Sequence, residues 1–284
     1  MNIHVAVFLH VATIGRYNEV MNESLKSLFS SKFDNYINLI EINVVGSGPI
    51  NLDYIDNRIT VYRRSDNIRD FEIPTVNSIW KYSINNSDAK ILYLNCLGGR
   101  YVGAGYETRR TWRQMLYQYY IEDMPRCLAL LTRHDACGVL WHEKPLPHFA
   151  SNNWWANASY IASLIDPAAF ADRVEKSNLD TFGPNWKESA HKRRHSAEFW
   201  IGSGEDFKPV GLMKFRSIVL PKTFTSSYPW WELQGIDWGL RARIERKRNA
   251  PYERLISSAQ NVRAAARYHI KKAYDWLRAP LIKS

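Results

Sequence analysis

Short apolar runs alternate with helical patterns along the first half of the 284-residue chain. Runs rich in Val, Ile and Leu are typical of buried strands, whereas apolar residues at steps of three or four indicate a helix with one buried face. The runs predict strands at 3–12, 36–45, 59–62, 89–94 and 136–141. The helical steps predict helices at 20–29, 75–84, 109–133 with a break at Met124-Pro125, and 156–164. This order predicts an α/β, Rossmann-like fold in which helices flank a mainly parallel sheet.

Residues 241–284 differ from the rest of the chain in charge and in pattern. They hold twelve Lys or Arg and three acidic residues, whereas residues 1–240 hold 26 basic and 25 acidic residues. After Pro251, apolar residues recur every three or four positions, which predicts a basic amphipathic helix that stops at Pro280. We therefore expect a domain at 1–240 and a helical tail at 241–284. The tail either packs on the domain with its basic face in water, or binds an anionic membrane surface or a partner, including a second copy of itself.

Charge, cysteine content and hydropathy exclude several classes of protein. The formal net charge of +10 resides almost entirely in the tail, so the near-neutral body does not predict a nucleic-acid partner. The three cysteines, Cys96, Cys127 and Cys137, lack the spacing of a structural zinc site or a disulfide scaffold. The N-terminal residues do not form a signal-peptide pattern, and no apolar run reaches the roughly 18 residues that a membrane span needs. These features predict a cytoplasmic protein, peripheral at the inner membrane face if the tail binds lipid.

Ligands of a parallel α/β sheet bind beyond the carboxyl ends of its strands. This rule selects the segments 10–16, 63–66 and 95–100. The sequence has neither a P-loop nor a G-x-S-x-G pattern, which excludes those two kinds of site. The glycines at 98–105 contain G-x-G without a third glycine in register, and they predict a flexible loop able to cover a phosphate.

Residues 147–156 combine polar side chains with two adjacent tryptophans. A sugar needs fixed hydrogen-bond partners for its hydroxyls and a flat apolar surface for its C–H faces, so this mixture indicates a sugar site. The alternative is a helix start capped by Ser151 or Asn152, with both tryptophans in the core.

Glu198 is the first candidate for a general base. It stands among apolar neighbours in the segment 195–202, and such surroundings favour a carboxylate that takes up a proton near neutral pH. The alternative role is a structural hydrogen-bond acceptor, and Glu205 and Asp206 are competing carboxylates just downstream.

Six segments resemble, in the same order, a family of GT-A type glycosyltransferases from bacteria and large viruses that includes chlorovirus rhamnosyltransferase domains. They are 71–77 (FEIPTVN), 91–94 (ILYL) with Gly98, 112–116 (WRQML), 135–139 (DACGV), 148–156 (HFASNNWWA) and 198–202 (EFWIG). The match spans about residues 5–205, and its most specific part is His-Phe-x-x-Asn-x-Trp-Trp-Ala at 148–156. The tail lies outside this match.

The resemblance implies a GT-A-like fold and transfer of a sugar from a nucleotide-diphosphate sugar, with UDP favoured. The acceptor would be a glycan or a lipid-linked precursor in surface polysaccharide biosynthesis, such as lipopolysaccharide or capsule. The polar, mixed composition of residues 165–197 predicts a subdomain on the acceptor side of the site. We expect inversion by direct displacement, with Glu198 as the base and Asp135 or Glu205 as the runners-up. The donor-binding residues that it implies are Thr13, Arg64, Asp66, Thr75, Asn95 and Arg100. The sugar-binding residues are His148, Asn152, Asn153 and Trp154.

GT-A enzymes often bind a divalent metal through Asp-x-Asp after the fourth strand, but this chain has Asn95-Cys96-Leu97 there. That segment has no carboxylate and would be a poor magnesium or manganese site. We therefore expect weak or absent metal dependence and no tightly bound cofactor. Phosphate charge would be offset instead by Arg64, Arg100 or Arg109. The same departure supports a second hypothesis, a catalytically inactive protein that binds a glycan or nucleotide as the partner of another transferase.

Overall fold

The computed structural model describes residues 3–143, 146–176 and 189–212. The strands are β1 (Val5–Ala12), β2 (Ile37–Val45), β3 (Ile59–Ser65), β4 (Lys90–Asn95), β5 (Ala136–Gly138), β6 (Trp141–His142), β7 (His148–Phe149), β8 (Trp154–Asn157) and β9 (Pro209–Gly211). The α-helices are α1 (Tyr17–Ser30), α2 (Ile73–Asn85), α3 (Gly103–Tyr117), α4 (Met124–Leu130), α5 (Ala158–Ser163), α6 (Pro167–Lys176) and α7 (Ser189–Trp200). Within these ranges no helix combines the length and the apolar character needed to cross a bilayer. The predicted tail, its membrane contact and its boundary at residue 240 lie outside the described residues.

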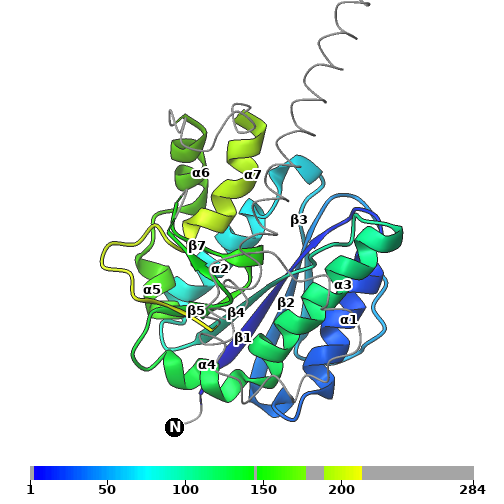
Figure 1. Cartoon of the computed structure of the whole chain (residues 1–284), viewed down its shortest axis with the longest axis horizontal. Coiled ribbons are helices and arrows are strands. Elements are labelled where there is room, and N and C mark those ends of the chain that lie inside the picture. The colour runs from blue at the N-terminus through cyan, green and yellow to red at the C-terminus, as the bar shows by residue number, and fades with distance from the viewer. Residues whose placement is uncertain (1–2, 144–145, 177–188, 213–284) are drawn as a thin grey trace, which may run out of the picture. The chain divides into compact units, whose positions relative to one another are not determined.

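Seven strands form one sheet in the order β3-β2-β1-β4-β8-β5-β9 (Figure 1). Strands β3, β2, β1 and β4 are parallel, whereas β8 runs antiparallel to both β4 and β5. The predicted α/β fold with a mainly parallel sheet is therefore confirmed. Because β2 joins β1 on one side and β4 joins it on the other, the direction of winding reverses between β1 and β4. Open α/β sheets bind their ligands at such a switch point, beyond the carboxyl ends of the strands.

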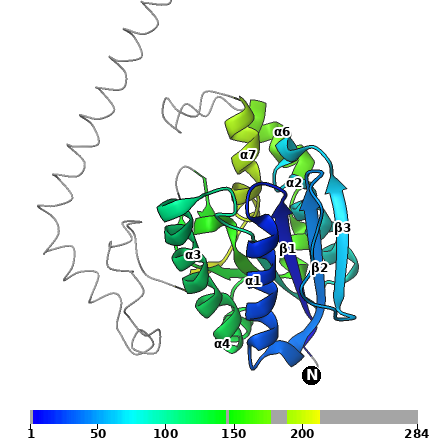
Figure 2. The same ribbon diagram turned by 90° about the vertical axis from the view of Figure 1, so that its right-hand side faces the viewer.

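Helices cover both faces of the sheet (Figures 1 and 2). Side chains of α1, α3 and α4 pack with Val7 and Leu9 of β1 in one core layer. Side chains of α2, α5, α6 and α7 pack with Phe8 of β1 in the other layer. Successive side chains of a strand point to opposite faces, so the continuous apolar run of β1 serves both layers at once.

For the paired tryptophans, the structure confirms one part of the alternative prediction, their burial in the core, and contradicts the other, a helix start. Trp154 and Trp155 lie in β8 rather than at a helix start. Both side chains are fully buried, and they belong to opposite core layers as successive residues of a strand do. The predicted helix at 156–164 is shortened to α5, and the predicted polar subdomain at 165–197 contains α6 and most of α7.

The glycine-rich segment after β4 is also more ordered than predicted. Gly103 and Gly105 lie in the first turn of α3, so the G-x-G pattern is helical and only residues 96–102 connect the strand to the helix. The predicted break at Met124-Pro125 is confirmed, because α4 begins at Met124 after a π turn at Gln118–Glu122.

Candidate functional site

The carboxyl end of β4 holds a hydrogen-bonded network centred on the carboxyl group of Glu72. Glu72 is the residue that precedes α2, and its oxygens accept hydrogen bonds from the side-chain amides of Asn95 and Asn152. The hydroxyl of Tyr93 donates to the same carboxyl group at 3.2 Å. Asn95 ends β4, and its backbone N–H donates to the Asn153 side chain at 2.5 Å. The network therefore joins the start of α2, the end of β4 and the turn before β8 at the switch point of the sheet.

The turn that supplies Asn152 has an unusual backbone. Ser151 and Asn152 have φ angles of 68° and 49°, in the left-handed region that costs most residues energy and that Asn tolerates better than others. Strained backbone of this kind tends to occur at ligand-binding sites, where the surrounding structure imposes it. Within the described residues, the buried Asn152 Oδ1 atom receives no hydrogen bond. Asn152 is only 1% exposed, so this acceptor faces the interior beside Glu72 rather than open solvent.

Opposing effects set the ionisation of Glu72. Burial of the carboxyl group and the nearby charge of Glu198 raise the pKa of Glu72, and the hydrogen bonds from Asn152, Tyr93 and Asn95 lower it again. The net result raises the pKa of Glu72 from its ordinary value of 4.5 to about 7. The three donors suit an ionised carboxylate, whereas burial favours the neutral acid, so Glu72 changes its charge near neutral pH.

We expect this buried acid to make the stability of the protein depend on pH. Because its pKa is about 7 in the folded state and 4.5 ordinarily, folding takes up a proton between those values. The contribution of Glu72 to the free energy of unfolding is then greatest below pH 4.5 and falls as pH rises to 7, by up to about 1.4 kcal/mol per pH unit. Urea denaturation of the wild type and of Glu72→Gln between pH 5 and 8 measures it. The wild type should lose stability relative to the variant as pH rises.

The exposed Glu107→Gln variant is the control for this prediction, and its stability should follow the wild-type pH profile. Parallel profiles for the wild type and Glu72→Gln would mean that Glu72 ionises with ordinary acidity in the folded protein.

Glu198 faces the same network from α7. Its carboxylate lies 3.2 Å from the Nδ1 atom of His195, and its side chain is 30% exposed. The charge of Glu198 acts on both Glu72 and Tyr93, which places it beside the network without burying it. A carboxylate that water and a ligand can reach is able to take a proton from that ligand, and Glu198 is not tied to the asparagines that hold Glu72.

The structure divides the predicted donor-binding residues into two groups. Asn95 is part of the Glu72 network, whereas Thr13, Asp66 and Arg100 lie in the loops that follow β1, β3 and β4. Thr75 does not fit the prediction, because it has no exposed surface for a donor, whereas the role of Arg64 stays a prediction. Thr75 is fully buried and hydrogen-bonded to His10 at 2.8 Å, and the guanidinium of Arg64 is held by Glu41, Asn43 and Ser78.

Among the predicted sugar-binding residues, Asn152 and Asn153 join the network, and His148 packs edge-on against Phe199 of α7, next to Glu198. Trp154 requires a correction. Its indole is fully buried against Tyr93, with 5.1 Å between ring centres, so it supports the network from below and offers no surface to a sugar.

Asp135 does not lie near the other predicted catalytic residues. It precedes β5, and Ala136 pairs with Ala156, which pairs with Ile91 near the start of β4. Asp135 is therefore at the amino edge of the sheet, opposite Asn95, and its carboxylate accepts a hydrogen bond from the Lys208 backbone N–H at 2.8 Å. This position corrects its assignment as an alternative base.

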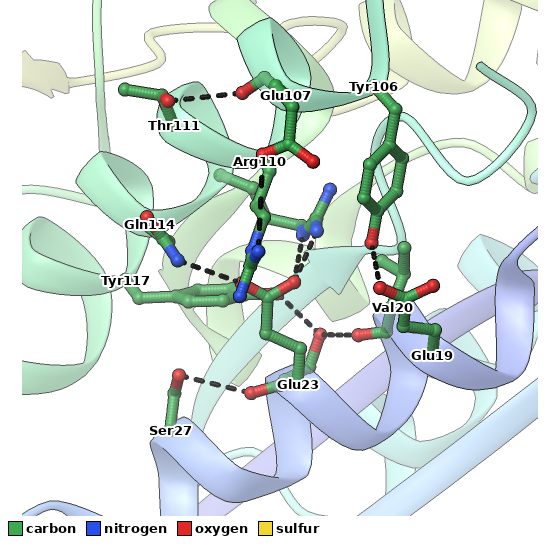
Figure 3. Close-up of polar contacts among 12 residues, drawn as sticks. Glu19, Val20, Glu23, Ser27, Tyr106, Glu107, Arg110, Thr111, Gln114 and Tyr117 are labelled. Carbon is green, nitrogen blue, oxygen red and sulfur yellow. Dashed lines mark hydrogen bonds and ion pairs between the residues drawn. The ribbon is translucent and has the colours of Figure 1, made fainter. Parts of the chain in front are cut away.

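A buried ion pair supports the loop that follows β4. Figure 3 shows Glu23 of α1 facing α3, where Arg110 and Gln114 approach its carboxylate. Arg113, only 1% exposed, forms an ion pair with Glu23 and also donates to the Leu97 carbonyl oxygen at 2.7 Å. The packing of α1 on α3 thereby fixes the backbone just beyond the Glu72 network.

Glu72 is the central residue that the sequence analysis did not select. It occurs in the segment FEIPTVN, where a carboxylate stands just before an Ile-Pro helix start. Its position there is typical of a residue at a helix N-terminus. Only its distance in space from Asn95 and Asn152, which the sequence does not reveal, distinguishes it from an ordinary helix-start residue.

The chemistry available at this site is proton transfer and hydrogen bonding to a polar ligand. Within the described ranges, no three His, Cys, Asp or Glu side chains are grouped as metal ligands.

No curated protein matches the chain. A family model described as a domain of unknown function, DUF8361, matches residues 6–278. Since this match covers nearly the whole sequence, including every residue of the Glu72 network, the chain belongs to the DUF8361 family.

Proposed function

We propose that this protein is a glycosyltransferase that uses a nucleotide-diphosphate sugar and transfers the sugar to a glycan or lipid-linked acceptor in surface polysaccharide biosynthesis. The observation that carries the proposal is the placement of Glu198 beside the Glu72 network, at the carboxyl end of β4. An accessible carboxylate and amides held in fixed positions are groups that orient and deprotonate a sugar hydroxyl.

The proposed fold assignment is GT-A type. The parallel order β3-β2-β1-β4 followed by the antiparallel strand β8 is compatible with it. The six segments that resemble glycosyltransferases support it further, because Glu72, Asn95, Asn152 and Glu198 come from or directly follow four of them.

In the proposed mechanism, Glu198 removes the proton from the acceptor hydroxyl as the hydroxyl oxygen attacks the anomeric carbon of the donor sugar. The bond from that carbon to the diphosphate oxygen breaks, and its electron pair leaves with the nucleoside diphosphate. Asn152 and Asn95 are held in place by Glu72, so the wall of the site beside Glu198 is rigid. Attack from the face opposite the leaving group inverts the anomeric centre.

The part of the donor site that binds the nucleoside would lie at the ends of β1 and β2. Gly46 has a φ of 103°, and a Cβ atom there would be 2.1 Å from the Thr13 hydroxyl oxygen. The Thr13 hydroxyl in turn accepts a hydrogen bond from the Gly48 N–H at 3.2 Å. This close backbone packing gives a nucleoside a rigid surface of peptide groups at the strand ends.

A thermal-shift screen with UDP-, GDP-, dTDP- and CMP-sugars, each with and without manganese, tests the proposal. We expect one nucleotide class to raise the melting temperature, since a ligand at 100 times its Kd adds about 2.7 kcal/mol of stability. The same nucleotide sugar should be turned over when acceptor glycans are added.

Two other results would redirect the proposal. Binding of a nucleotide sugar without hydrolysis or transfer would support the second hypothesis, an inactive binding partner of another transferase. Folded protein that responds to no nucleotide sugar contradicts the donor site altogether.

A further inference from the structure

The loop between β4 and α3 is fixed at several points along its backbone. The Gly99 carbonyl accepts a hydrogen bond from the Arg16 N–H at 2.7 Å, and the Leu97 carbonyl accepts one from Arg113, also at 2.7 Å. Gly98 has a φ of 91°, and a Cβ atom there would lie 2.5 Å from the Cβ of Arg109. The loop therefore packs directly against α3, beside the end of β4, and the side chains that it bears have defined positions.

Two guanidinium groups meet at one aromatic ring on this loop. The Cζ atoms of Arg100 and Arg109 lie 5.0 and 5.2 Å from the ring centre of Tyr101. Arg100 also donates a hydrogen bond to the Tyr101 hydroxyl at 3.0 Å. Both arginines are exposed, and the ring brings their charged ends together on the loop that follows β4.

The neighbouring arginines differ from this pair because carboxylates balance their charge. Arg16 lies 3.5 Å from Glu19, and Arg110 lies within 4.0 Å of Glu107 and Glu23. Within the described part of the chain, no acidic side chain forms an ion pair with Arg100 or Arg109. Two like charges held at one ring repel each other, and an anion that contacts both removes that repulsion.

We propose that Arg100 and Arg109, positioned by Tyr101, bind a diphosphate group directly. Each guanidinium fork matches the oxygens of one phosphoryl group, and two forks at one ring match the two linked phosphoryl groups of a diphosphate. This inference rests on the proposed function when the diphosphate is that of the sugar donor. There, both guanidiniums stabilise the negative charge that the leaving nucleoside diphosphate gains as its bond to the anomeric carbon breaks. A polyprenyl diphosphate of a lipid-linked acceptor offers the same chemistry.

Calorimetric titrations in EDTA test the inference with defined probes. UDP, GDP and dTDP are each compared with their monophosphates, beside inorganic pyrophosphate and vesicles that contain farnesyl diphosphate. We expect the preferred diphosphate to bind about tenfold more weakly to Arg100→Gln and to Arg109→Gln, and about 100-fold more weakly to the double variant. The matching monophosphate should lose much less, since it has one phosphoryl group to offer.

Arg110→Gln is the matched control, because it removes an exposed arginine from the next position of the same helix. Its affinity should stay within about threefold of the wild type. Melting temperatures of all variants establish that they are folded. Equal diphosphate affinity of the wild type and the double variant overturns the inference.

The outcomes separate this inference from the proposed function. Nucleoside diphosphate binding that survives the double substitution rejects the arginine pair and leaves the transferase proposal standing. Arginine-dependent binding of pyrophosphate or of farnesyl diphosphate vesicles, without any nucleoside diphosphate, supports the pair and rejects the nucleotide donor. Failure of every diphosphate probe to bind rejects the pair as an anion site.

Discussion

Replacing Glu198 with Gln is expected to lower the rate of sugar transfer by about 10²- to 10⁴-fold. The amide keeps nearly the same shape and size but cannot accept the proton of the attacking hydroxyl. Donor binding should change little, because Glu198 lies on α7 and the proposed nucleotide surface follows β1 and β2. Initial rates at saturating donor, together with the Kd of the donor for wild type and variant, separate loss of proton transfer from loss of binding.

Glu205→Gln is the control for this prediction, since Glu205 is an exposed carboxylate seven positions further along the chain. It should keep most of the wild-type rate. A Glu198→Gln variant that transfers sugar at close to the wild-type rate under donor saturation would falsify the assignment of the base. If Glu205→Gln alone were inactive, that carboxylate would take its place.

Replacing Arg113 with Met is expected to reduce the free energy of unfolding by about 3–5 kcal/mol. The substitution keeps much of the apolar volume but leaves the Glu23 carboxylate without its closest cation and the Leu97 carbonyl without its donor. Arg113 is 1% exposed and the Glu23 side chain 18% exposed, so little water can replace the lost partner. Urea denaturation followed by circular dichroism measures the change.

Two further variants show where that loss arises. Arg110→Met removes a 46% exposed arginine that contacts the same carboxylate, and it should cost no more than about 1 kcal/mol. The double variant Glu23→Gln/Arg113→Met removes the unpaired charge, so it should be more stable than Arg113→Met alone. A cost below about 1 kcal/mol for Arg113→Met would contradict the role of this ion pair in holding α1 on α3.

The sequence predicts the first four strands well because their signal is local. Residues 3–12 form a continuous apolar run, and β1 occupies Val5–Ala12 with every residue up to Val11 buried. The helix predicted at 75–84 is the body of α2 (Ile73–Asn85), where Val76 and Ile79 face the core as their spacing requires. The hydrophobic pattern within the element itself is enough to predict elements of this kind.

Elements in the second half depend on partners that are distant in sequence. β8 has only four residues, and it is a strand because β4 and β5 bind it on both sides. In the described part of α7, the buried residues Ser196, Ala197, Phe199 and Trp200 gather in its last turns after a polar start, so no apolar stripe of full length appears in the sequence. Tertiary contacts, rather than local preference, decide both elements.

The candidate site could be predicted only in part for the same reason. The rule for strand ends selects Asn95, which the structure places in the Glu72 network, and composition draws attention to Asn152 and Glu198. Composition alone cannot distinguish Trp154, which packs in the core, from its polar neighbours. A tryptophan beside asparagines is equally compatible with a core position and with a sugar-binding position. Glu72 becomes a candidate only in the folded structure, where the side chains of Asn95 and Asn152 donate hydrogen bonds to its carboxyl group.

The separation of these partners along the chain has a consequence for how the protein folds. Glu72 and Asn152 are 80 residues apart, and Asn95 and Asn153 are 58 apart. During synthesis the Glu72 carboxyl group is hydrated and ordinarily acidic until the segment with both asparagines has been made. Closing so long a loop is entropically costly, so we expect the contacts to form late, after the local pairing of β1, β2 and β3. Burial of Glu72 as this segment docks takes up a proton between about pH 4.5 and 7, which links completion of the site to the acidity of the medium in which the chain folds.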